Sequence, residues 1–303
     1  MSWAVGIDVG GTNIKAVAVS ADGVVRHRAS CATDDGVVDV AEWSRRALGL
    51  IAGFEQAEES ATAIVGVCAP GLAAADGRSI AHLPGKLAGI AGVDWTRALR
   101  RSAPVPVVND AHAALLGEAW TGAASDRRHV VMLTLGTGIG GAVMSDGKLL
   151  RGAIGRAGHI GHMSLDPDGP VSIVGTPGAI EMLFGDCTVP ARTGGRFADT
   201  TALVAAHRAG DAVATEVWLR SIHALGSAVG SCINLFDPEL VVLGGGIAQA
   251  GDALFAPLRA ELDRIEWRPG GHRVPVVAAT LGEWAGAIGA AWHAFNPNNR
   301  ARP

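Results

Sequence analysis

Two stretches of this 303-residue chain repeat one pattern of apolar and polar positions. The first, Trp3 to Gly23, is an apolar run, a glycine turn with threonine, and a second apolar run that ends in Ser-Ala-Asp-Gly. The second, Val130 to Gly147, has the same order and ends in Ser-Asp-Gly. Each pattern predicts a β-hairpin. The repetition predicts two related domains, each with a hairpin turn that faces a shared cleft.

Between and after the hairpins, short apolar runs alternate with segments of helical spacing. We expect helices over 37–59, 111–120, 212–236, 248–262 and 284–295, and strands over 63–68, 105–108, 240–243 and 274–279. Strands that alternate with helices predict an α/β fold. At 49% hydrophobic residues and 18% charged residues, the chain has the material for a large core, and its length fits two domains.

Charge and targeting signals narrow the function classes. The formal net charge of −4 gives no basic surplus for nucleic acid or an anionic membrane, so we expect neither as a partner. The N-terminal run has no preceding basic stretch and contains Asp8, unlike a signal peptide. No apolar run is long enough to span a bilayer. The expected location is the cytoplasm.

The four cysteines lie far apart and form neither a CxxC pair nor a disulfide-rich pattern. They are typical of small buried residues in a reducing compartment. The 42 glycines, in contrast, gather at a few places. Because glycine exposes backbone N–H groups and tolerates unusual conformations, these clusters are the first candidates for ligand binding.

The two hairpin turns are candidate phosphate sites. The first turn combines Asp8 with Gly10, Gly11, Thr12 and Lys15, which offer bare backbone, a hydroxyl and a positive charge. Taken alone, the paired glycines are equally well explained by a type I′ turn. The second turn repeats the composition with Thr137 and Gly138, and the pair is stronger than either turn alone. Neither turn leads into a helix, and no GxxxxGK[ST] motif occurs, which excludes a Rossmann or Walker site.

A third glycine cluster follows the strand expected at 240–243. Gly244, Gly245 and Gly246 would let a nucleotide lie against backbone, or would only allow a tight strand-to-helix turn. Residues 281–287 contain several small side chains that either flank an adenine or permit close helix packing. We expect packing for most of them.

Asn109 and Asp110 come directly after the strand expected at 105–108. Open α/β sheets bind ligands at the carboxyl ends of their strands, and a carboxylate there can accept the proton of an attacking hydroxyl. The alternative is a helix N-cap for residues 111–120, which either residue would supply. The two interpretations are compatible if one residue caps and the other reaches out.

In this order, the motifs resemble the ROK family of sugar kinases and repressors, within the actin/hexokinase-like ATPase superfamily. The resemblance rests on 8–15, 109–110, 133–141, 155–162, and 243–247 with 281–291, and it spans essentially the whole chain. It implies a two-domain actin/hexokinase-like (ribonuclease H-like) fold with a cleft between the domains. The expected domains are 1–112, completed by a C-terminal helix at 285–303, and 113–284.

The resemblance implies a role for each matching residue. Asp110 would be the general base, and Asp8 would help to hold Mg²⁺ through water near the γ-phosphate of ATP. Phosphate and nucleotide contacts would come from Gly10, Gly11, Thr12, Lys15, Thr137, Gly138, Gly244, Gly245 and Gly246. Gly71 would line the substrate pocket with Asn109 and Asp110. Repressor members carry an N-terminal helix-turn-helix, and this chain starts at the first hairpin, which argues against a regulator.

The substrate loop departs from the family pattern. The family usually has Glu-x-Gly-His, both side chains touching sugar hydroxyls, where this chain has His159-Ile160-Gly161-His162. A carboxylate accepts two hydrogen bonds whereas a neutral imidazole donates one and accepts one, so the recognised hydroxyl pattern is expected to differ. We expect substrate contacts from His162 and Glu181, and His159 is a further candidate. His82 falls where many relatives have Asn, as a substrate contact or a surface-loop histidine.

Many family members also carry a zinc motif with three cysteines. At the aligned positions, 172–181, this chain retains two glycines and Glu181 but has none of the three thiolates. A structural Zn²⁺ needs about four ligands, so we expect no zinc site. A new metal site from His159 and His162 with Asp166 or Asp168 is a weaker alternative.

These inferences predict an ATP-dependent kinase that acts on a hydroxyl of a hexose, an amino sugar or a related polyol. A C7-cyclitol-type kinase of the same family is an alternative, because a carbocycle keeps the hydroxyls and lacks the ring oxygen. A non-catalytic sugar sensor is a second alternative, against which the retained Asp110 and both hairpin turns argue. A homodimer is expected from the family alone.

Overall fold

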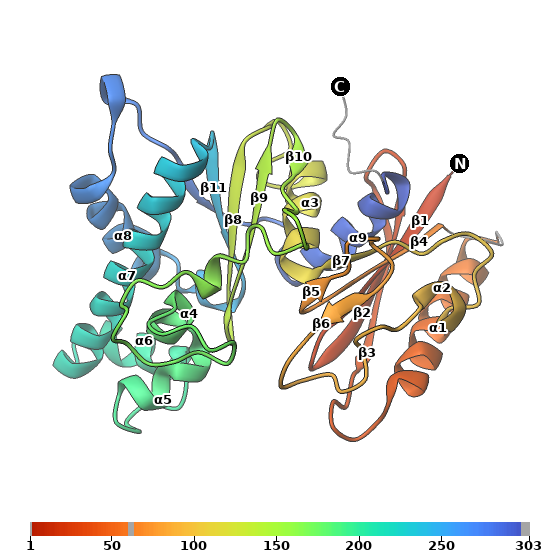
Figure 1. Ribbon diagram of the computed structural model, residues 1–303, viewed down its shortest axis with the longest axis horizontal. Coiled ribbons are helices and arrows are strands. Elements are labelled where there is room, and N and C mark those ends of the chain that lie inside the picture. The colour runs from red at the N-terminus through yellow and green to blue at the C-terminus, as the bar shows by residue number, and fades with distance from the viewer. Residues whose placement is uncertain (1, 60–63, 298–303) are drawn as a thin grey trace. The chain divides into compact units, whose positions relative to one another are not determined.

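The computed structural model describes residues 2–59 and 64–297, and it divides into two compact units (Figure 1). Unit 1 comprises residues 1–126, 147–157 and 280–303, and unit 2 comprises residues 127–146 and 158–279. The expected boundary at 112/113 would divide helix α3 (Asp110–Thr121), which lies wholly in unit 1 because it packs along α9 (Ala285–Phe295). Residues 298–303 of the expected C-terminal helix lie outside the described residues.

The main sheet of unit 1 has the strand order β3-β2-β1-β4-β7. β1 and β2 form the first predicted hairpin, with Trp3 opposite Ser20 and Asp8 opposite Lys15. β4 and β7 add in parallel. The strands of this sheet are β1 Trp3–Val9, β2 Asn13–Ser20, β3 Val25–Ala32, β4 Ile64–Ala69 and β7 Val107–Asn109. The expected strand residue 63 lies outside the described residues.

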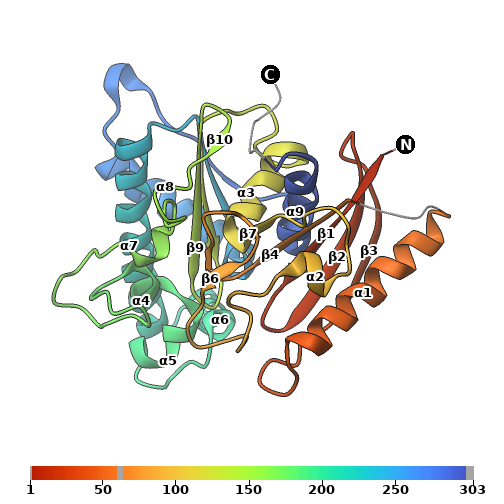
Figure 2. The same cartoon turned by 45° about the vertical axis from the view of Figure 1, so that its right-hand side comes forward.

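Smaller elements complete unit 1. They are α1 Val40–Ala57, α2 Trp95–Ala98, the short hairpin of β5 Leu72–Ala73 and β6 Ile80–His82, the strand β10 Lys148–Leu149 and the 3₁₀ turn η5 Gly282–Trp284. Helices α1 and α9 lie on opposite faces of the main sheet (Figures 1 and 2). Alternation along β1 explains this arrangement, since Val5, Ile7 and Val9 face the cluster of α1 while Ala4 faces α9.

Glycines in the strands allow α9 to lie directly on the sheet. A Cβ on Gly6 of β1 would lie 1.8 Å from the Ala287 carbonyl oxygen, and one on Gly66 of β4 would lie 2.1 Å from the Ala290 oxygen. No side chain fits at these distances. Within the 281–287 segment, the packing interpretation fits Ala285 to Ala287 of α9, whereas Gly282 has no atom close to its Cβ position.

Unit 2 repeats this architecture. β10, β9, β8, β11 and β12 lie in that order in one sheet, in which β9, β8, β11 and β12 correspond to β2, β1, β4 and β7, with the same antiparallel hairpin and the same parallel additions. The second predicted hairpin and the internal repeat are thus confirmed. The strands are β8 Val130–Leu135, β9 Ile139–Ser145, β11 Leu240–Gly244 and β12 Val276–Ala278.

The helices of unit 2 include α7, whose bounds Ala212–Phe236 are those predicted. The others are α4 Ile180–Phe184, α5 Val189–Arg192, α6 Thr200–Arg208 and α8 Asp252–Ile265, with 3₁₀ turns η1 Ile160–His162, η2 Asp186–Thr188, η3 Gly246–Ala250 and η4 Pro269–Gly271. The helix expected over 248–262 is wrong at its start. Gly251 has φ 58° and ψ −131°, so η3 ends there and α8 begins after it.

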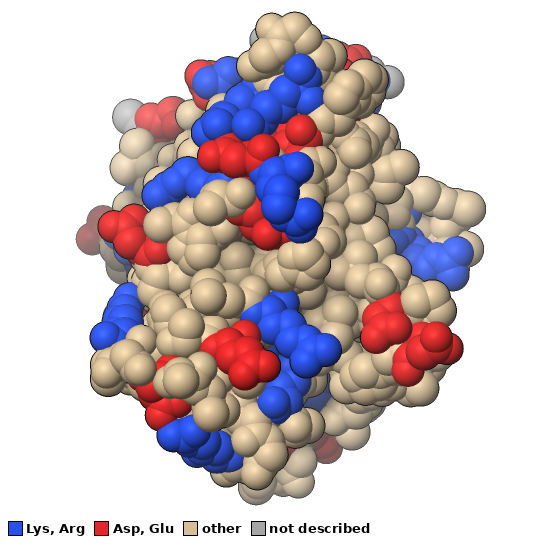
Figure 3. Space-filling view, turned by 90° about the vertical axis from the view of Figure 1, so that its left-hand side faces the viewer, with Lys and Arg blue, Asp and Glu red and all other residues tan. Residues whose placement is uncertain are grey.

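Among the residues that the structure describes, no helix combines the length and apolarity needed to cross a bilayer. On the face drawn in Figure 3, basic and acidic side chains are interspersed rather than separated into patches. Some surface charges are paired, as Arg273 and Asp263 in unit 2 are at 2.6 Å.

Candidate active site

Three strands of unit 1 end at one edge of the sheet, and the predicted polar residues lie there. Asp8 of β1 is in register with Cys68 of β4, and Ala69 of β4 is in register with Asn109 of β7. Because β1, β4 and β7 are parallel, their carboxyl ends meet. The structure therefore brings Asp8, Asn109 and Asp110 to the same edge, as the sequence predicts.

The Asp110 carboxylate is held by one of its two oxygens. Its Oδ1 accepts hydrogen bonds from the Ala111 backbone N–H and from the Asn109 side-chain amide, both at 2.9 Å. Among the described residues, no protein donor is bonded to Oδ2, and the side chain is only half-buried. One carboxylate oxygen is fixed and the other is open to a ligand.

Asn109 is the N-cap of α3, which decides between the two predicted caps. Its Oδ1 accepts hydrogen bonds from the backbone N–H groups of Ala111 and His112, and its Nδ2 donates to the Gly71 carbonyl and to Asp110 Oδ1. All four hydrogen-bonding positions of this buried amide are used within the protein. In this structure Asn109 positions Asp110 and Gly71, rather than presenting a free group to a substrate.

The backbone conformation at position 71 requires a glycine. Its φ is +99°, and a Cβ there would lie 2.6 Å from the His82 carbonyl oxygen. His82 itself ends β6 with an exposed side chain. Gly71 also lies beside Asn109, because its carbonyl accepts a hydrogen bond of 2.9 Å from the Asn109 side-chain amide.

Asp8 lies in a crowded, negatively charged position. Burial and the charge of Asp110 raise its pKa to about 7, against the opposing effects of Lys15, a hydrogen bond from the Cys68 thiol, and Lys86. A Cβ on Gly286 of α9 would lie 2.8 Å from Asp8 Oδ2, so the helix approaches the carboxylate closely. The sequence did not identify Cys68, Lys86 or Gly286, which reach Asp8 from distant segments.

The glycines of the first hairpin turn do not have the conformation of a type I′ turn. Among the described residues with positive φ, neither Gly10 nor Gly11 is found. A Cβ on Gly10 would lie 3.0 Å from the Asn13 carbonyl oxygen, and one on Gly11 would meet only Lys86, at 4.0 Å. The turn is fixed from behind by the Thr33 hydroxyl, which donates to the Gly10 carbonyl at 2.6 Å. The glycines thus leave bare backbone, which favours the ligand interpretation.

Lys15 has a partner within the protein. Its Nζ lies 2.8 Å from Glu283 Oε2, and it also donates to the Glu283 backbone carbonyl at 3.3 Å. The predicted phosphate contact by Lys15 therefore competes with an ion pair that joins two segments 268 residues apart.

The second hairpin turn lies in unit 2 against Glu181. A Cβ on Gly138 would lie 2.1 Å from Glu181 Oε2, and the same oxygen accepts the Ile139 backbone N–H at 3.1 Å. The Thr137 carbonyl accepts the Cys187 backbone N–H at 3.0 Å. Glu181 therefore supports the turn with one oxygen, a contact that the sequence did not indicate.

His159 precedes the 3₁₀ turn η1 and His162 ends it, and this turn packs on the second hairpin. The rings of His159 and His162 are stacked with centroids 6.4 Å apart, and a Cβ on Gly161 would lie 1.8 Å from the Ile139 carbonyl oxygen. Within residues 2–59 and 64–297, no group of three or more His, Cys, Asp or Glu side chains is arranged to hold a metal ion.

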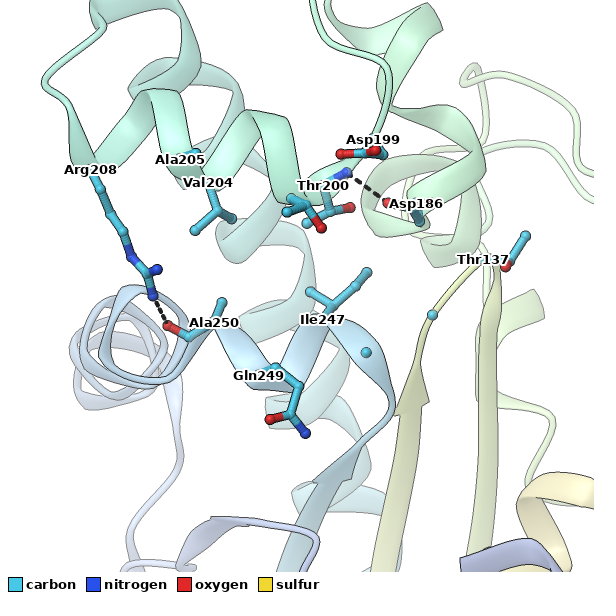
Figure 4. A pocket seen from close by; sticks show the side chains of 13 residues that line it. Thr137, Asp186, Asp199, Thr200, Val204, Ala205, Arg208, Ile247, Gln249 and Ala250 are labelled. Carbon is cyan, nitrogen blue, oxygen red and sulfur yellow. Dashed lines mark hydrogen bonds between the residues drawn. The ribbon is translucent and has the colours of Figure 1, made fainter. Parts of the chain in front are cut away.

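The glycine cluster after β11 borders a cavity of about 540 Å³ within unit 2 (Figure 4). Gly245 has φ +87° and its Cβ would lie 2.3 Å from the Leu135 carbonyl oxygen, so the tight-turn explanation holds for it. Gly246 has no such neighbour and lines the cavity. Gly244 ends β11, where a Cβ would contact Met132 at 3.0 Å.

The cavity runs from the second hairpin turn to α6 and η3. Gly136 and Thr137 lie at one end, and Arg208 at the other donates a hydrogen bond of 2.6 Å to the Ala250 carbonyl. Val204 of α6 and Ile247 of η3 lie on opposite sides (Figure 4). Other lining residues are polar: Asp186, Asp199, Thr200, Thr201 and Gln249. A volume of this size suits a nucleotide-sized ligand.

Comparison with known protein families shows to which family this chain belongs. The model of the ROK family matches residues 4–296. This chain belongs to the ROK family. A glucokinase from Thermotoga maritima is 34% identical over 95% of each chain, and an N-acetylmannosamine kinase from Escherichia fergusonii is 33% identical over 94% of this chain and 96% of its own.

Solved ROK structures share the fold. A glucokinase from Streptomyces griseus, in complex with glucose and AMPPNP, superposes with a TM-score of 0.79 at 28% identity, covering 97% of this chain and 100% of its own. A hexokinase from Thermus thermophilus gives 0.83 at 29% identity, over 98% and 99%. The predicted α/β fold of the actin/hexokinase-like class is thus confirmed, and the chain is a phosphotransferase of the sugar-kinase type.

Proposed function

We propose that this ROK protein transfers the γ-phosphate of ATP to a hydroxyl of a hexose or amino sugar, with Asp110 as general base. The observation that carries the proposal is the state of the Asp110 carboxylate. One oxygen is held by Asn109 and Ala111, and the other is open at the strand edge that also carries Asp8. A fixed carboxylate with one open oxygen is what proton abstraction from a substrate hydroxyl requires.

The proposed step is an in-line displacement. Asp110 accepts the hydroxyl proton of the substrate while the substrate oxygen forms a bond to the γ-phosphorus. The bond from that phosphorus to the β–γ bridging oxygen breaks, and ADP leaves with the electron pair. Little covalent chemistry falls to the protein, so positioning and charge stabilisation dominate.

The cavity of unit 2 is the proposed adenosine site. Its end at Gly136 and Thr137 would receive the phosphates, the carboxylates of Asp186 and Asp199 suit ribose hydroxyls, and apolar Val204 and Ile247 suit the faces of a base. The Streptomyces griseus relative was crystallised with AMPPNP, which supports ATP as the donor here.

Mg²⁺ is the proposed metal, held by Asp8 through water. The residues fit this ion, since Asp8 is a carboxylate whose pKa burial and the neighbouring Asp110 raise, a repulsion that a divalent cation relieves. When bound, Mg²⁺ would offset charge on the phosphoryl group. No zinc site is proposed, because the aligned positions lack all three cysteines.

Within unit 1, the acceptor is proposed to contact Gly71 as well as Asp110, and acceptor contacts from His159 and His162 of unit 2 stay predictions. Similar relatives are a glucokinase and an N-acetylmannosamine kinase, which makes glucose and N-acetylmannosamine the first sugars to test. His159 replaces a carboxylate by a group that both donates and accepts, so the preferred hydroxyl pattern is expected to differ from that of the family.

The test is a panel assay for ADP release. Purified protein with Mg-ATP would be incubated with glucose, mannose, N-acetylglucosamine, N-acetylmannosamine and a C7 cyclitol, and a parallel series with polyphosphate as donor would be followed by the phosphorylated product instead of ADP. Sugar-dependent ADP release supports the proposal, and release with the cyclitol alone would move the substrate to that class. Tight binding of one compound without any turnover would establish a sensor instead.

A further inference from the structure

We propose that Lys86 supplies the positive charge that stabilises the transferred phosphoryl group in the transition state. This inference rests on the proposed kinase reaction, and it assigns a further catalytic residue that the sequence motifs did not include. Its basis is the position of Lys86 beside the first hairpin turn, which directly follows Asp8 along the chain.

Geometry places the Lys86 side chain at the turn. Its Cδ is 4.0 Å from the point that a Cβ on Gly11 would occupy, and among the described residues it is the nearest atom outside Gly11 and its chain neighbours. The lysine therefore covers the backbone that the two glycines leave bare. Gly11 lies three residues after Asp8, so the lysine lies at the turn that follows this carboxylate.

The backbone beside Lys86 is fixed. Leu87 is 1% exposed in the core of unit 1, has φ +49°, and donates its N–H to Asp35 Oδ2 at 2.9 Å. Its carbonyl accepts the Ile90 backbone N–H at 3.0 Å. Lys86 itself is exposed. A flexible cation on an anchored backbone can follow a phosphoryl group without rebuilding the loop.

Charge balance distinguishes Lys86 from Lys15, the lysine that the sequence indicated. Lys15 is paired with Glu283 at 2.8 Å. No carboxylate of the described residues lies within ion-pair distance of Lys86. A phosphoryl group that approached Asp8 and Asp110 would meet two like charges, and Lys86 is the lysine at this edge with an uncommitted charge. A compact ammonium is well suited to phosphate oxygens as a point charge.

The test compares Lys86→Met with Lys148→Met, which removes an exposed lysine of β10. We expect Lys86→Met to lower kcat by about 10²- to 10³-fold, as for loss of one transition-state donor. The KM for the sugar, the Kd for ADP and Tm should change little, because ADP lacks the γ-phosphate. Lys86→Arg, which keeps the charge, should recover kcat to within about tenfold of wild type.

Three results would overturn the inference. If Lys86→Met and Lys148→Met had equal kcat in a protein that is an active kinase, Lys86 alone would be misassigned. A raised sugar KM at unchanged kcat would make Lys86 an acceptor contact. A wild-type protein that releases no ADP with any acceptor would refute the kinase proposal itself, and the role of Lys86 with it.

Discussion

Glu118 gives the sharpest stability prediction, because a fully buried carboxylate fastens α3 to the start of α9. Its side chain is 0% exposed. Oε1 accepts the backbone N–H groups of Thr280 and Leu281 at 3.0 and 2.8 Å, and Oε2 accepts the Ala123 N–H at 2.7 Å and the Thr280 hydroxyl at 3.1 Å. The perturbation is Glu118→Gln, which keeps the shape and replaces one oxygen by an NH₂ group.

The magnitude follows from where that NH₂ would point. In the Oε1 position it would leave two backbone N–H groups without an acceptor, whereas in the Oε2 position it would strand only the Ala123 N–H, since the Thr280 hydroxyl can rotate and accept. The second arrangement is the cheaper one. Hydrogen bonds to a charged group contribute about 1.5–3 kcal/mol, and a stranded buried donor costs about 1–3 kcal/mol. We expect Glu118→Gln to lose roughly 2–4 kcal/mol of unfolding free energy.

The assay is urea unfolding followed by tryptophan fluorescence at pH 7. Glu216→Gln is the matched control, because Glu216 is exposed on α7 and should change stability by less than about 0.5 kcal/mol. Glu118→Ala, which strands every donor and leaves a cavity, should cost more than Glu118→Gln. A loss for Glu118→Gln no larger than that of the control would refute the reasoning.

Two further predictions concern unit 1. Burial, with a smaller effect of Arg151, lowers the pKa of His293 from 6.5 to about 4. As the pH falls, the histidine is therefore protonated in the unfolded chain before it is protonated in the folded protein. The contribution of His293 to the unfolding free energy is fully present above about pH 6.5, and roughly 3 kcal/mol of it is lost as the pH drops toward 4. Unfolding curves of wild type and His293→Leu between pH 4 and 7.5 should show a shallower slope for the variant, and equal slopes would contradict this. Gly6→Ala should cost about 3 kcal/mol or more of unfolding free energy, or prevent folding, because its Cβ would lie 1.8 Å from a carbonyl oxygen. Gly49→Ala, in open space on α1, should stabilise the protein by about 0.5–1 kcal/mol. Comparable Tm values for the two variants would refute the packing argument.

Local signals predicted much of the fold. The two hairpins and the bounds of α7 were predictable because each depends on neighbouring residues, and the cap of α3 was narrowed to Asn109 or Asp110 for the same reason. The apolar pattern did not predict a helix start that is set by the backbone conformation of a single residue. Gly251 ends η3 and delays α8, although the apolar spacing continues across it.

The site residues that could be predicted from the sequence are those that lie at the carboxyl ends of predicted strands. Asp8, Asn109 and Asp110 reach one edge because three parallel strands end there. The roles of Lys15, Lys86 and Glu181 depend on contacts between distant segments, and no local pattern specifies such contacts. Glu283 takes up Lys15, Gly11 meets Lys86, and Gly138 meets Glu181.

The central claim is that Asp110 is the base of a sugar kinase, and single-turnover transfer from γ-labelled ATP tests it most directly. Asp110→Asn keeps a carbonyl that can accept the Ala111 and Asn109 hydrogen bonds, so folding and the Kd values of sugar and ADP should stay within about threefold of wild type. The rate should fall by about 10²- to 10⁴-fold. Asp252→Asn, whose side chain is 97% exposed, should transfer at the wild-type rate. A rate for Asp110→Asn close to that of Asp252→Asn would contradict the account.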